Sequence, residues 1–276
     1  MDLKNISPEE IKNMDYNQLI GIVRETNRPP GGKSSIFEII NRLHITKRTK
    51  ILEIGTSTGF TPIEISRIVR CPIVSIDINE DSLTEAKNRA EKEGYHNIDF
   101  QKGDVNELSF NDDLFNIVIV GNVFSLLSDK KRALKECARV CKKDGFIITM
   151  PMYYIKEPSD VLVKKVSKAI GITITPMYKK DWINFLFVED LETYWSKDFI
   201  FDFISDEKIG DFLNDIMNRP HLKDLHKEAH LELLKTYKEF MFLFRDNLSH
   251  MGYSIMILIK KRIWEDPELF TSQERK

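Results

Sequence analysis

Short apolar runs that alternate with polar, helix-forming stretches dominate the chain from Lys50 onwards. The apolar runs are ILEIG, PIVSIDI, NIDFQKGD, NIVIVGN and FIITMPM, and the stretches between them predict helices near residues 61–70, 81–93 and 128–142. Strands that alternate with helices form βαβ units, whose parallel sheet is covered by helices on both faces. The pattern therefore predicts an α/β fold with a doubly wound, mostly parallel sheet.

The flanking segments add helices and two more strands. Capping boxes at Ser7–Glu10 and Ser35–Glu38 and a cap at Asp15, with a helix to about Thr26, predict N-terminal helices. Later, helices are expected near 157–169 and over much of 206–248, and strands at DLETYWSKDFIFDF and YSIMILIKK, which makes seven strands in all. We expect four segments: an N-terminal helical cap (1–49), a Rossmann-like core (50–204), a helical insertion or lid (205–250), and a closing strand with a tail (251–276).

Composition limits the class of partner. The 276 residues are 42% hydrophobic and 30% charged, with a net charge of -2, so no strong attraction for nucleic acid is expected. The chain shows no signal-peptide pattern and no apolar run that would span a bilayer, and Cys71, Cys137 and Cys141 form no CxxC pair. These observations favour a cytoplasmic protein that does not enter membranes and uses its cysteines for packing.

The most informative motif is the glycine turn after the first strand. Gly55 and Gly59 enclose Thr56-Ser57-Thr58, and the preceding strand ends with Glu53. Glycines let backbone N–H groups approach a ligand closely. The spacing is GxxxG rather than the GxGxxG of dinucleotide sites, and a carboxylate at this place would repel a pyrophosphate but attract a cationic ligand. The sequence at Thr61–Glu64 also fits a capping box, which predicts that the next helix starts there.

At this point the sequence resembles the class I, Rossmann-like family of S-adenosylmethionine-dependent methyltransferases, whose first motif is (D/E)xGxGxG. Glu53, Gly55 and Gly59 match this motif, and Ser57 stands in place of its middle glycine. The resemblance extends through VSIDIN, QKGDV, FNIVIVGN and ECARVCKKDGFIIT, and it covers roughly residues 50–152.

The resemblance implies a site for S-adenosylmethionine, with S-adenosylhomocysteine as its product. Glu53 and the turn that follows would hold the methionine part, Asp77 the ribose hydroxyls, and Asp104 the adenine amino group. The implied cofactor residues are Glu53, Gly55, Thr56, Ser57, Gly59, Phe60, Asp77, Ile78, Asp104, Val105 and Asn122.

Acceptor residues are expected after the fourth and fifth strands, because ligands bind outside the carboxyl ends of the strands in such sheets. Asn122, Tyr153 and Tyr154 are the catalytic candidates, and Phe124 is a candidate for acceptor binding. Arg28 lies in the linker TNRPPGGK, which is either a simple turn between helices or a loop that brings a cation to an anionic group of the acceptor.

Two further sets of residues have competing interpretations. Trp182, Tyr194 and Trp195 either line an acceptor pocket or pack within the helical region, and packing is favoured. His226 and His230 have the i, i+4 spacing of metal ligands, but Glu228 lies at the wrong offset for an HExxH site. We therefore expect solvated histidines and no metal.

The sequence predicts an enzyme that transfers a methyl group from S-adenosylmethionine to a small molecule by in-line displacement. The sulfonium is already an activated leaving group, so such a site mainly positions the reactants, and a hydroxyl acceptor would also need a general base. Two alternatives stay open: methylation of a protein, peptide or RNA, and a non-catalytic protein that keeps the fold and binds the cofactor.

Overall fold

A sheet of eight strands runs through the computed structural model, which describes residues 3–188 and 190–261. The strands are β1 (Ile51–Ile54), β2 (Ile73–Asp77), β3 (Ile98–Lys102), β4 (Phe115–Gly121), β5 (Cys141–Thr149), β6 (Met152–Tyr154), β7 (Leu191–Ile200) and β8 (Met251–Lys260). Their order is β3-β2-β1-β4-β5-β8-β6, and β7 pairs with the other side of β8. The pairs from β3 to β5 are parallel, whereas β8 is antiparallel to all three of its neighbours.

The predicted α/β fold class is confirmed, with one strand more than the expected seven. The additional strand is β6, which starts at Met152, the last residue of the expected run FIITMPM, and ends at Tyr154. Proline has no N–H to donate to a neighbouring strand, so the regular ladder is interrupted at Pro151. The backbone still follows the sheet there, because the N–H of Met150 donates to the carbonyl oxygen of Gly121 and the carbonyl oxygen of Pro151 accepts from the N–H of Ser254. Regular pairing with β8 resumes at Met152.

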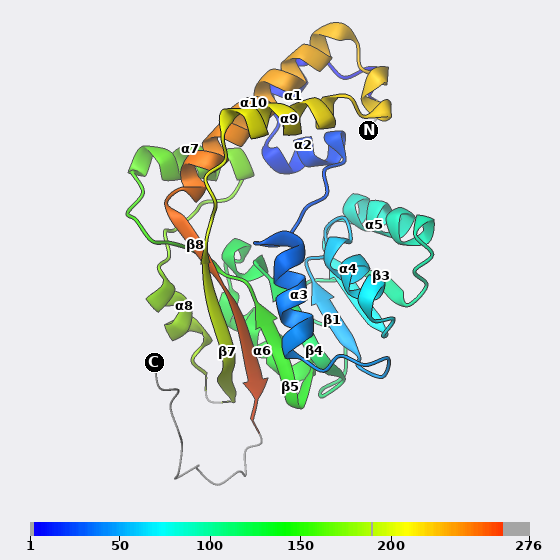
Figure 1. Cartoon of the computed structure of the whole chain (residues 1–276), viewed down its shortest axis with the longest axis vertical. Helices are drawn as coiled ribbons and strands as arrows, with labels where there is room; N and C mark the ends of the chain where they lie inside the picture. Colours follow the sequence, from blue (N-terminus) through cyan, green and yellow to red (C-terminus); the bar gives the residue numbers. More distant parts are fainter. Residues whose placement is uncertain (1–2, 189, 262–276) are drawn as a thin grey trace.

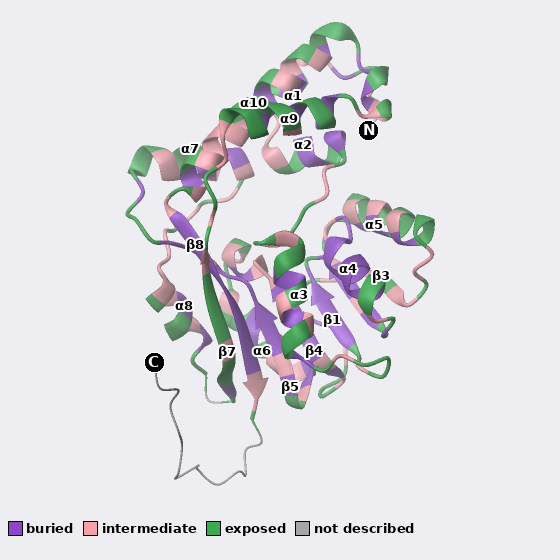
Figure 2. Ribbon diagram, viewed as in Figure 1, coloured by how far each residue is buried: buried purple, intermediate pink, exposed green. Residues whose placement is uncertain are grey.

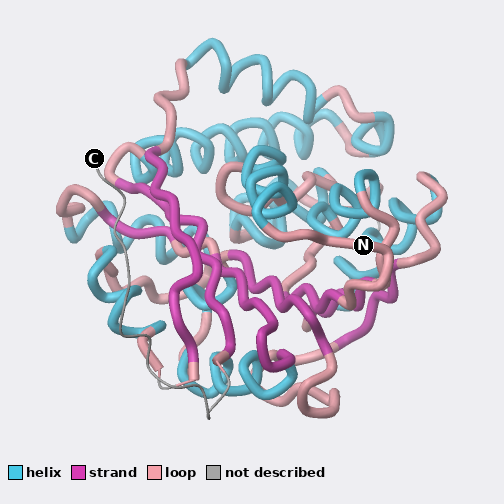
Figure 3. The backbone as a smooth tube through the Cα atoms, turned by 60° about the horizontal axis from the view of Figure 1, so that its bottom comes forward, coloured by secondary structure: helices cyan, strands magenta, loops and turns pink. Residues whose placement is uncertain are grey.

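Both faces of the sheet are covered by helices, as Figure 3 shows. In β1, Ile51 packs on one face, and Leu52 and Ile54 pack on the other. The first face is covered by α3 (Gly32–Arg42), α4 (Phe60–Ile68) and α5 (Glu80–Lys92). The opposite face is covered by η1 (Val123–Leu126), α6 (Lys130–Val140) and α8 (Lys179–Leu186). The three cysteines are free and buried, in agreement with a packing role.

The remaining helices form a lobe over the carboxyl ends of the parallel strands (Figure 1). They are α1 (Pro8–Asn13), α2 (Tyr16–Val23), α7 (Asp160–Ile170), α9 (Asp206–Met217), η2 (Pro220–Asp224) and α10 (Lys227–Leu248). A separate apolar core holds α1, α2, α9, η2 and α10 together, and its buried members include Ile11, Leu19, Leu213 and Leu233. Figure 2 shows that exposed residues lie mostly on the outer surfaces of these helices.

A buried polar cluster joins α2 to α10. The carboxylate of Glu25 accepts hydrogen bonds from the hydroxyls of Tyr16, at 3.0 Å, and of Tyr237. Nearby, Arg219 donates to the carbonyl oxygen of Val23 at 2.6 Å, where α2 ends. Helix ends leave carbonyl groups without partners inside the helix, and a cation is well placed to satisfy them. The lobe is therefore anchored at the point where the chain enters the linker towards the sheet.

Helix starts were predicted correctly where a side chain provides the cap. Ser7 and Asp15 cap α1 and α2 as expected, although α2 ends at Val23 rather than near Thr26. The capping boxes expected at Ser35 and Thr61 are wrong: α3 and α4 start after Gly31 and Gly59, which have positive φ angles and provide no side-chain cap. The hydroxyl of Ser35 instead donates to the carbonyl oxygen of Pro30 at 2.6 Å.

The expected division into four segments stays a prediction, although the contacts show how these segments mix. Helix α3 packs on the sheet and not in the lobe, while α7 contacts α2 and α10. The final part of the expected tail, 262–276, lies outside the described residues. None of the described helices is both long enough and apolar enough to cross a membrane. The cytoplasmic location also stays a prediction.

The turn before α4 provides a test of the packing between β1 and α5. Gly59 has a φ of +79°, and a Cβ atom there would lie 2.9 Å from the Cβ of Ala86. Gly94 has a similar φ of +73°, and a Cβ atom there would meet nothing within 4 Å, so Gly94 isolates the cost of the backbone conformation. We expect Gly94→Ala to cost about 1 kcal/mol and Gly59→Ala about 3 kcal/mol in the free energy of unfolding, measured with urea. Equal losses in the two variants would contradict this packing.

Candidate active site

A large hollow lies between the carboxyl ends of the strands and the helical lobe, and its volume is about 1350 Å³. One wall comes from β1, β4 and the loops that follow them, and the other comes from α2, α7, α8, α9, α10 and residues 172–177. Ligand sites for single small molecules usually have about 300–1,000 Å³. The hollow is therefore large enough for two ligands at once.

The glycine turn forms the floor of this cavity beside β1. The N–H groups of Gly55 and Thr56 both donate to the carbonyl oxygen of Ile76, at 2.8 and 3.0 Å, which ties the turn to β2. A Cβ atom on Gly55 would lie 2.3 Å from Cγ2 of Val123, so only glycine fits. Ser57 has a φ of +47°, the left-handed conformation that glycine adopts at little cost. The turn therefore keeps the backbone path of a glycine at the position where the sequence departs from the family motif.

Glu53 places a carboxylate beneath this turn with very little contact to solvent. Its side chain lines the cavity, yet the residue is only 4% exposed. Within the described chain, Oε2 of Glu53 and the nearby hydroxyl of Thr56 are buried without a hydrogen-bond partner. Burial raises the pKa of Glu53 to about 8; the hydroxyl groups of Thr56 and Ser75 oppose this rise, and the Asp77 carboxylate adds to it.

Asp77 lies at the carboxyl end of β2, next to the turn. One of its carboxylate oxygens accepts from the backbone N–H of Ser57 at 2.8 Å, and the other accepts from the N–H of Asn79 at 2.9 Å. Each oxygen keeps a further lone pair, so the carboxylate can accept two more hydrogen bonds. The sheet thus brings together two acids, Glu53 and Asp77, that are 24 residues apart in the sequence.

The third acid lies further along the same edge, after β3. Oδ1 of Asp104 accepts from the backbone N–H of Asn106 at 2.8 Å, and the carboxylate is exposed. Val105 is buried in the core below it, while Ile78, which follows Asp77, is 70% exposed. The polar and apolar groups expected for the adenosine half therefore lie at successive strand ends, outside the walls of the main cavity.

The four residues proposed for the acceptor side fall into two groups. Asn122 and Tyr154 line the cavity: Oδ1 of Asn122 accepts from the hydroxyl of Ser125 at 2.6 Å, and the hydroxyl of Tyr154 donates to Asn247 at 2.8 Å. Phe124 and Tyr153 do not belong to its walls. Phe124 is buried in the core beneath η1.

Tyr153 points to the other side of the sheet because successive residues of a strand face in opposite directions. Its hydroxyl lies 3.1 Å from the hydroxyl of Ser254, which donates its proton to Asp198 at 2.6 Å. Burial raises the pKa of Tyr153. A buried tyrosine in this network is positioned to stabilise the packing of β6, β7 and β8.

The linker between α2 and α3 crosses the cavity wall, and five of its residues, from Asn27 to Gly31, line it. Arg28 is one of them, with its guanidinium 5.6 Å from the ring centre of Phe60. The expected position of Arg28 near the site is thus observed, while Phe60 is buried below it. A cation held over an aromatic ring beside the glycine turn is available to an anionic group of either ligand.

Trp182 and the two histidines have defined partners. Trp182 is buried, lines the cavity, and donates from its indole N–H to the carbonyl oxygen of Met152 at 3.0 Å. Tyr194 and Trp195 lie on β7 away from the cavity, where they pack against Phe146 and Arg42.

His226 and His230 contact backbone carbonyl oxygens, and no group of three metal-ligating side chains occurs among residues 3–188 and 190–261.

The sequence alone did not identify the residues of the lobe that close the cavity. These are apolar side chains of the helices and of the segment after α7: Ile20, Val166, Ile172, Ile174, Met177, Phe185, Ile209, Phe212, Met241, Phe244 and Leu248. Their helical spacing was visible, but spacing cannot tell which of them face a ligand and which face another helix. We call this wall, together with Tyr16, Tyr154, Lys208, Arg245 and Asn247, the acceptor chamber.

The residues at the turn fit S-adenosylmethionine. A buried carboxylate without a partner would be satisfied by the cationic methionine part, because an opposite charge and hydrogen bonds favour the ionised form. The turn leaves no room for a side chain at Gly55, and Asp77 has lone pairs free for two hydroxyl groups. These features suit the methionine and ribose parts of the ligand, and the roles of the individual residues stay predictions.

Comparison with known proteins gives the same class. A family profile described as a methyltransferase domain matches residues 45–182, half of the chain. The chain therefore belongs to the methyltransferase domain family, whose members are S-adenosylmethionine-dependent enzymes of the Rossmann-like class I fold.

Three relatives are similar in sequence. A protein of Haemophilus influenzae described as uncharacterized is 29% identical over 161 residues, 57% of this chain and 64% of the relative. The Bacillus subtilis protein described as uncharacterized methyltransferase YcgJ is 30% identical over 40% of this chain and 43% of the relative. A demethylmenaquinone methyltransferase of Staphylococcus haemolyticus is 26% identical over 62% of this chain and 69% of the relative. The match thus covers less than two thirds of the length of the first two.

Solved structures share the fold. The MccD protein superposes with a TM-score of 0.72 at 22% identity, covering 85% of this chain and 100% of MccD. A phosphoethanolamine N-methyltransferase from Haemonchus contortus, in complex with phosphomonomethylethanolamine and S-adenosylhomocysteine, gives a TM-score of 0.64 at 14% identity, over 93% of this chain and 58% of that one. At these identities the similarity establishes the fold alone.

The raised pKa of Glu53 has a consequence for stability. Between the ordinary value of 4.5 and about 8, the folded chain holds a proton that the unfolded chain has released, so the free energy of unfolding falls as the pH rises through this window. For a fully buried group this loss amounts to about 5 kcal/mol. We expect Glu53→Gln to remove most of the pH dependence, measured by urea unfolding at about pH 5 and about pH 9.

Glu91, an exposed carboxylate on α5, provides the matched control. Glu91→Gln should leave the pH dependence of unfolding as it is in the native chain. If Glu53→Gln has the same slope as the native protein, the carboxylate is not buried as described.

Proposed function

We propose that this protein transfers a methyl group from S-adenosylmethionine to a small-molecule acceptor and releases S-adenosylhomocysteine. The observation that carries the proposal is the buried carboxylate of Glu53, whose Oε2 has no hydrogen-bond partner in the described chain, beneath a glycine turn that opens into the cavity. When bound, S-adenosylmethionine supplies a methyl group on a sulfonium, which is already an activated leaving group.

In this proposal Glu53 holds the cationic methionine part, and the turn from Gly55 to Gly59 lets the ligand approach the backbone closely because its glycines carry no side chains. Asp77 accepts the ribose hydroxyls, Ile78 packs against the purine, and Asp104 and Val105 bind its polar edge. Each of these residues lies at a strand end or in the loop after it, which is where ligands bind in doubly wound sheets.

A small-molecule acceptor is supported by the helical lobe. The lobe closes the cavity over the strand ends with side chains from α2, α7, α9 and α10, so a substrate that reaches the methyl group has to fit inside the chamber. The relatives described as demethylmenaquinone methyltransferases and the structural neighbour with bound phosphomonomethylethanolamine are consistent with such an acceptor. A protein or RNA substrate would need an open approach instead.

Asn122 and Tyr154 are the residues of this chain proposed to touch the acceptor. Asn122 uses its carbonyl oxygen for Ser125 and for the N–H of Met152, which fixes the amide and leaves its NH₂ group for a ligand. Arg28 is proposed to bind an anionic group at the cavity mouth. These residues position the reactants, and positioning provides much of the rate of an in-line displacement.

The direct test is calorimetry with S-adenosylmethionine and S-adenosylhomocysteine on the native chain and on Asp77→Ala. Because hydrogen bonds to a charged group contribute about 1.5–3 kcal/mol, we expect Asp77→Ala to weaken both ligands by about tenfold to a hundredfold. Asp99→Ala is the control, since Asp99 is exposed on neighbouring β3 and its carboxylate accepts from Gln101. Absence of binding to the native chain would refute the proposal.

Binding should also release a proton from Glu53. The pKa of the free carboxyl is about 8, and a bound cation lowers it, so near pH 7 most molecules lose one proton when the ligand binds. Calorimetry in two buffers of different ionisation enthalpy measures this release. We expect nearly one proton for the native chain and none for Glu53→Gln, whose affinity should also be weaker. Equal proton release from both proteins would assign the proton to another group.

A second candidate function is a protein that binds the cofactor without catalysing transfer. Release of S-adenosylhomocysteine that depends on an added small-molecule acceptor distinguishes the two. Turnover with any member of a metabolite panel supports the enzyme, and ligand binding without turnover across the panel supports the non-catalytic protein.

A further inference from the structure

The acceptor chamber has a mainly apolar wall. Its side chains come from α2, α7, α8, α9, α10 and residues 172–177, and most of them are isoleucine, leucine, valine, methionine, phenylalanine or tryptophan. Burial of apolar surface contributes about 25 cal/mol per Å², and an apolar wall gives no hydrogen bonds to a strongly polar molecule. A ligand that fills this chamber therefore needs a large apolar body.

The charged groups on the cavity wall are mostly cations. The described lining residues include one carboxylate, Glu53, and four cationic side chains, Arg28, Lys130, Lys208 and Arg245. Arg245 is neutralised by Asp206 and Asp246. Lys208 and Arg28 form no ion pair with any described residue. Since Glu53 is assigned to the cofactor, the remaining field on the acceptor side is positive.

The cavity wall also offers no ordinary general base. Its described residues include no aspartate, histidine or cysteine. The hydroxyls of Tyr16 and Tyr154 each donate to a partner, Glu25 and Asn247, and burial raises the pKa of both tyrosines. Both phenols therefore stay protonated near neutral pH, and Glu53 is committed to a cation. The wall itself therefore presents no side chain that takes a proton directly from the acceptor.

We propose that the acceptor is an amphiphile with a large apolar body and a nucleophilic atom that is already anionic when it enters, such as a carboxylate, phenolate or enolate. This inference rests on the proposed function and specifies its substrate class. In the reaction, a bond forms between the anionic atom and the methyl carbon while the carbon–sulfur bond breaks and its electron pair goes to sulfur. A cation and an anion become two neutral products, and no proton is released.

The apolar chamber favours this charge type over the alternatives. Attraction between an anion and a sulfonium increases as the effective dielectric falls, and their mutual neutralisation suits a site that excludes water. A neutral alcohol would release a proton that no described wall residue can accept. A neutral amine would become a cation surrounded by apolar groups, Lys208 and Arg28, which is unfavourable.

Three probes with the same chain and different charge test the inference: dodecanoate, dodecanol and dodecylammonium. Each is titrated, below its micelle concentration, into the protein saturated with S-adenosylhomocysteine, and binding is measured by calorimetry. We expect dodecanoate to bind in a one-to-one complex at least about tenfold more tightly than dodecylammonium, a difference of about 1.4 kcal/mol. Butanoate, with the same head group and little apolar body, should bind at least about a hundredfold more weakly than dodecanoate.

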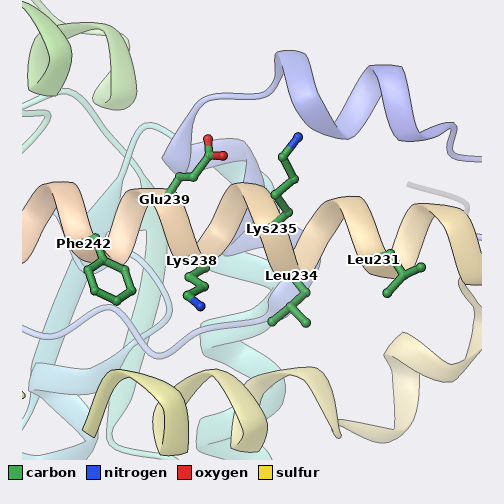
Figure 4. A pocket seen from close by; sticks show the side chains of 6 residues that line it. All are labelled: Leu231, Leu234, Lys235, Lys238, Glu239 and Phe242. Carbon is green, nitrogen blue, oxygen red and sulfur yellow. The ribbon is translucent and has the colours of Figure 1, made fainter. Parts of the chain in front are cut away.

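Charge reversal at Lys208 tests whether this cation causes the preference for dodecanoate over dodecylammonium. Lys208 is exposed on α9 and reaches the chamber, so Lys208→Glu should fold and should weaken dodecanoate at least about fivefold relative to dodecylammonium. Lys238→Glu is the matched control: Lys238 belongs to a separate shallow groove along α10, shown in Figure 4 with its neighbours Leu234 and Phe242. The control should keep the native preference.

Arg28→Gln provides a second variant, with the affinity for S-adenosylhomocysteine measured separately. Arg28→Gln should also reduce the preference for dodecanoate over dodecylammonium. Three outcomes would overturn the inference. The native protein could bind dodecylammonium as tightly as dodecanoate or more tightly, or it could bind butanoate and dodecanoate with equal affinity. Alternatively, Lys208→Glu and Lys238→Glu could have the same effect on the preference for dodecanoate. If S-adenosylhomocysteine itself does not bind, the proposed function fails, and this outcome is distinct from a failure of the charge preference.

Discussion

The carboxylate of Glu53 under the glycine turn is the interaction on which the site depends. Ionising a carboxyl group away from water is costly, and in the free protein this cost is expressed as a pKa of about 8. The chain keeps the acid at the end of β1, where Gly55 and Ser57 bend the backbone over it and tie the turn to β2. A ligand cation would favour the ionised form, so its binding would be coupled to the loss of the proton from Glu53.

The same arrangement explains why the turn has so little freedom. Gly55 meets Val123 and Gly59 meets Ala86 so closely that neither position has space for a side chain. Ser57, between them, adopts the left-handed backbone conformation and uses its N–H to hold Asp77. The motif is therefore defined by backbone geometry and by one acid on each side of it, and a serine is compatible with both.

The helical lobe gives the cavity a second property: its apolar surface lies on a different side from its acidic group. The sheet side of the cavity carries the acid Glu53, with Asp77 beside the turn but outside the cavity wall, whereas the lobe side carries apolar residues together with Lys208 and Arg245. Hydrogen bonds of Glu25 and Arg219 hold α2, α10 and the start of the linker that carries Arg28 together within the lobe. The two halves of the cavity thus differ in electrostatics because they come from different parts of the fold.

The sequence by itself determined the α/β fold, the strand ends that carry Glu53, Asp77 and Asp104, and the starts of helices capped by Ser7 and Asp15. These features depend on local periodicity and on groups a few residues apart, which a sequence displays directly. Tertiary structure alone decided that Tyr154 faces the cavity while Tyr153 faces away, that Phe124 is core, and that the lobe forms the acceptor chamber. Such outcomes depend on strand register and on how helices distant in sequence pack against one another, and a one-residue change of register reverses every side chain.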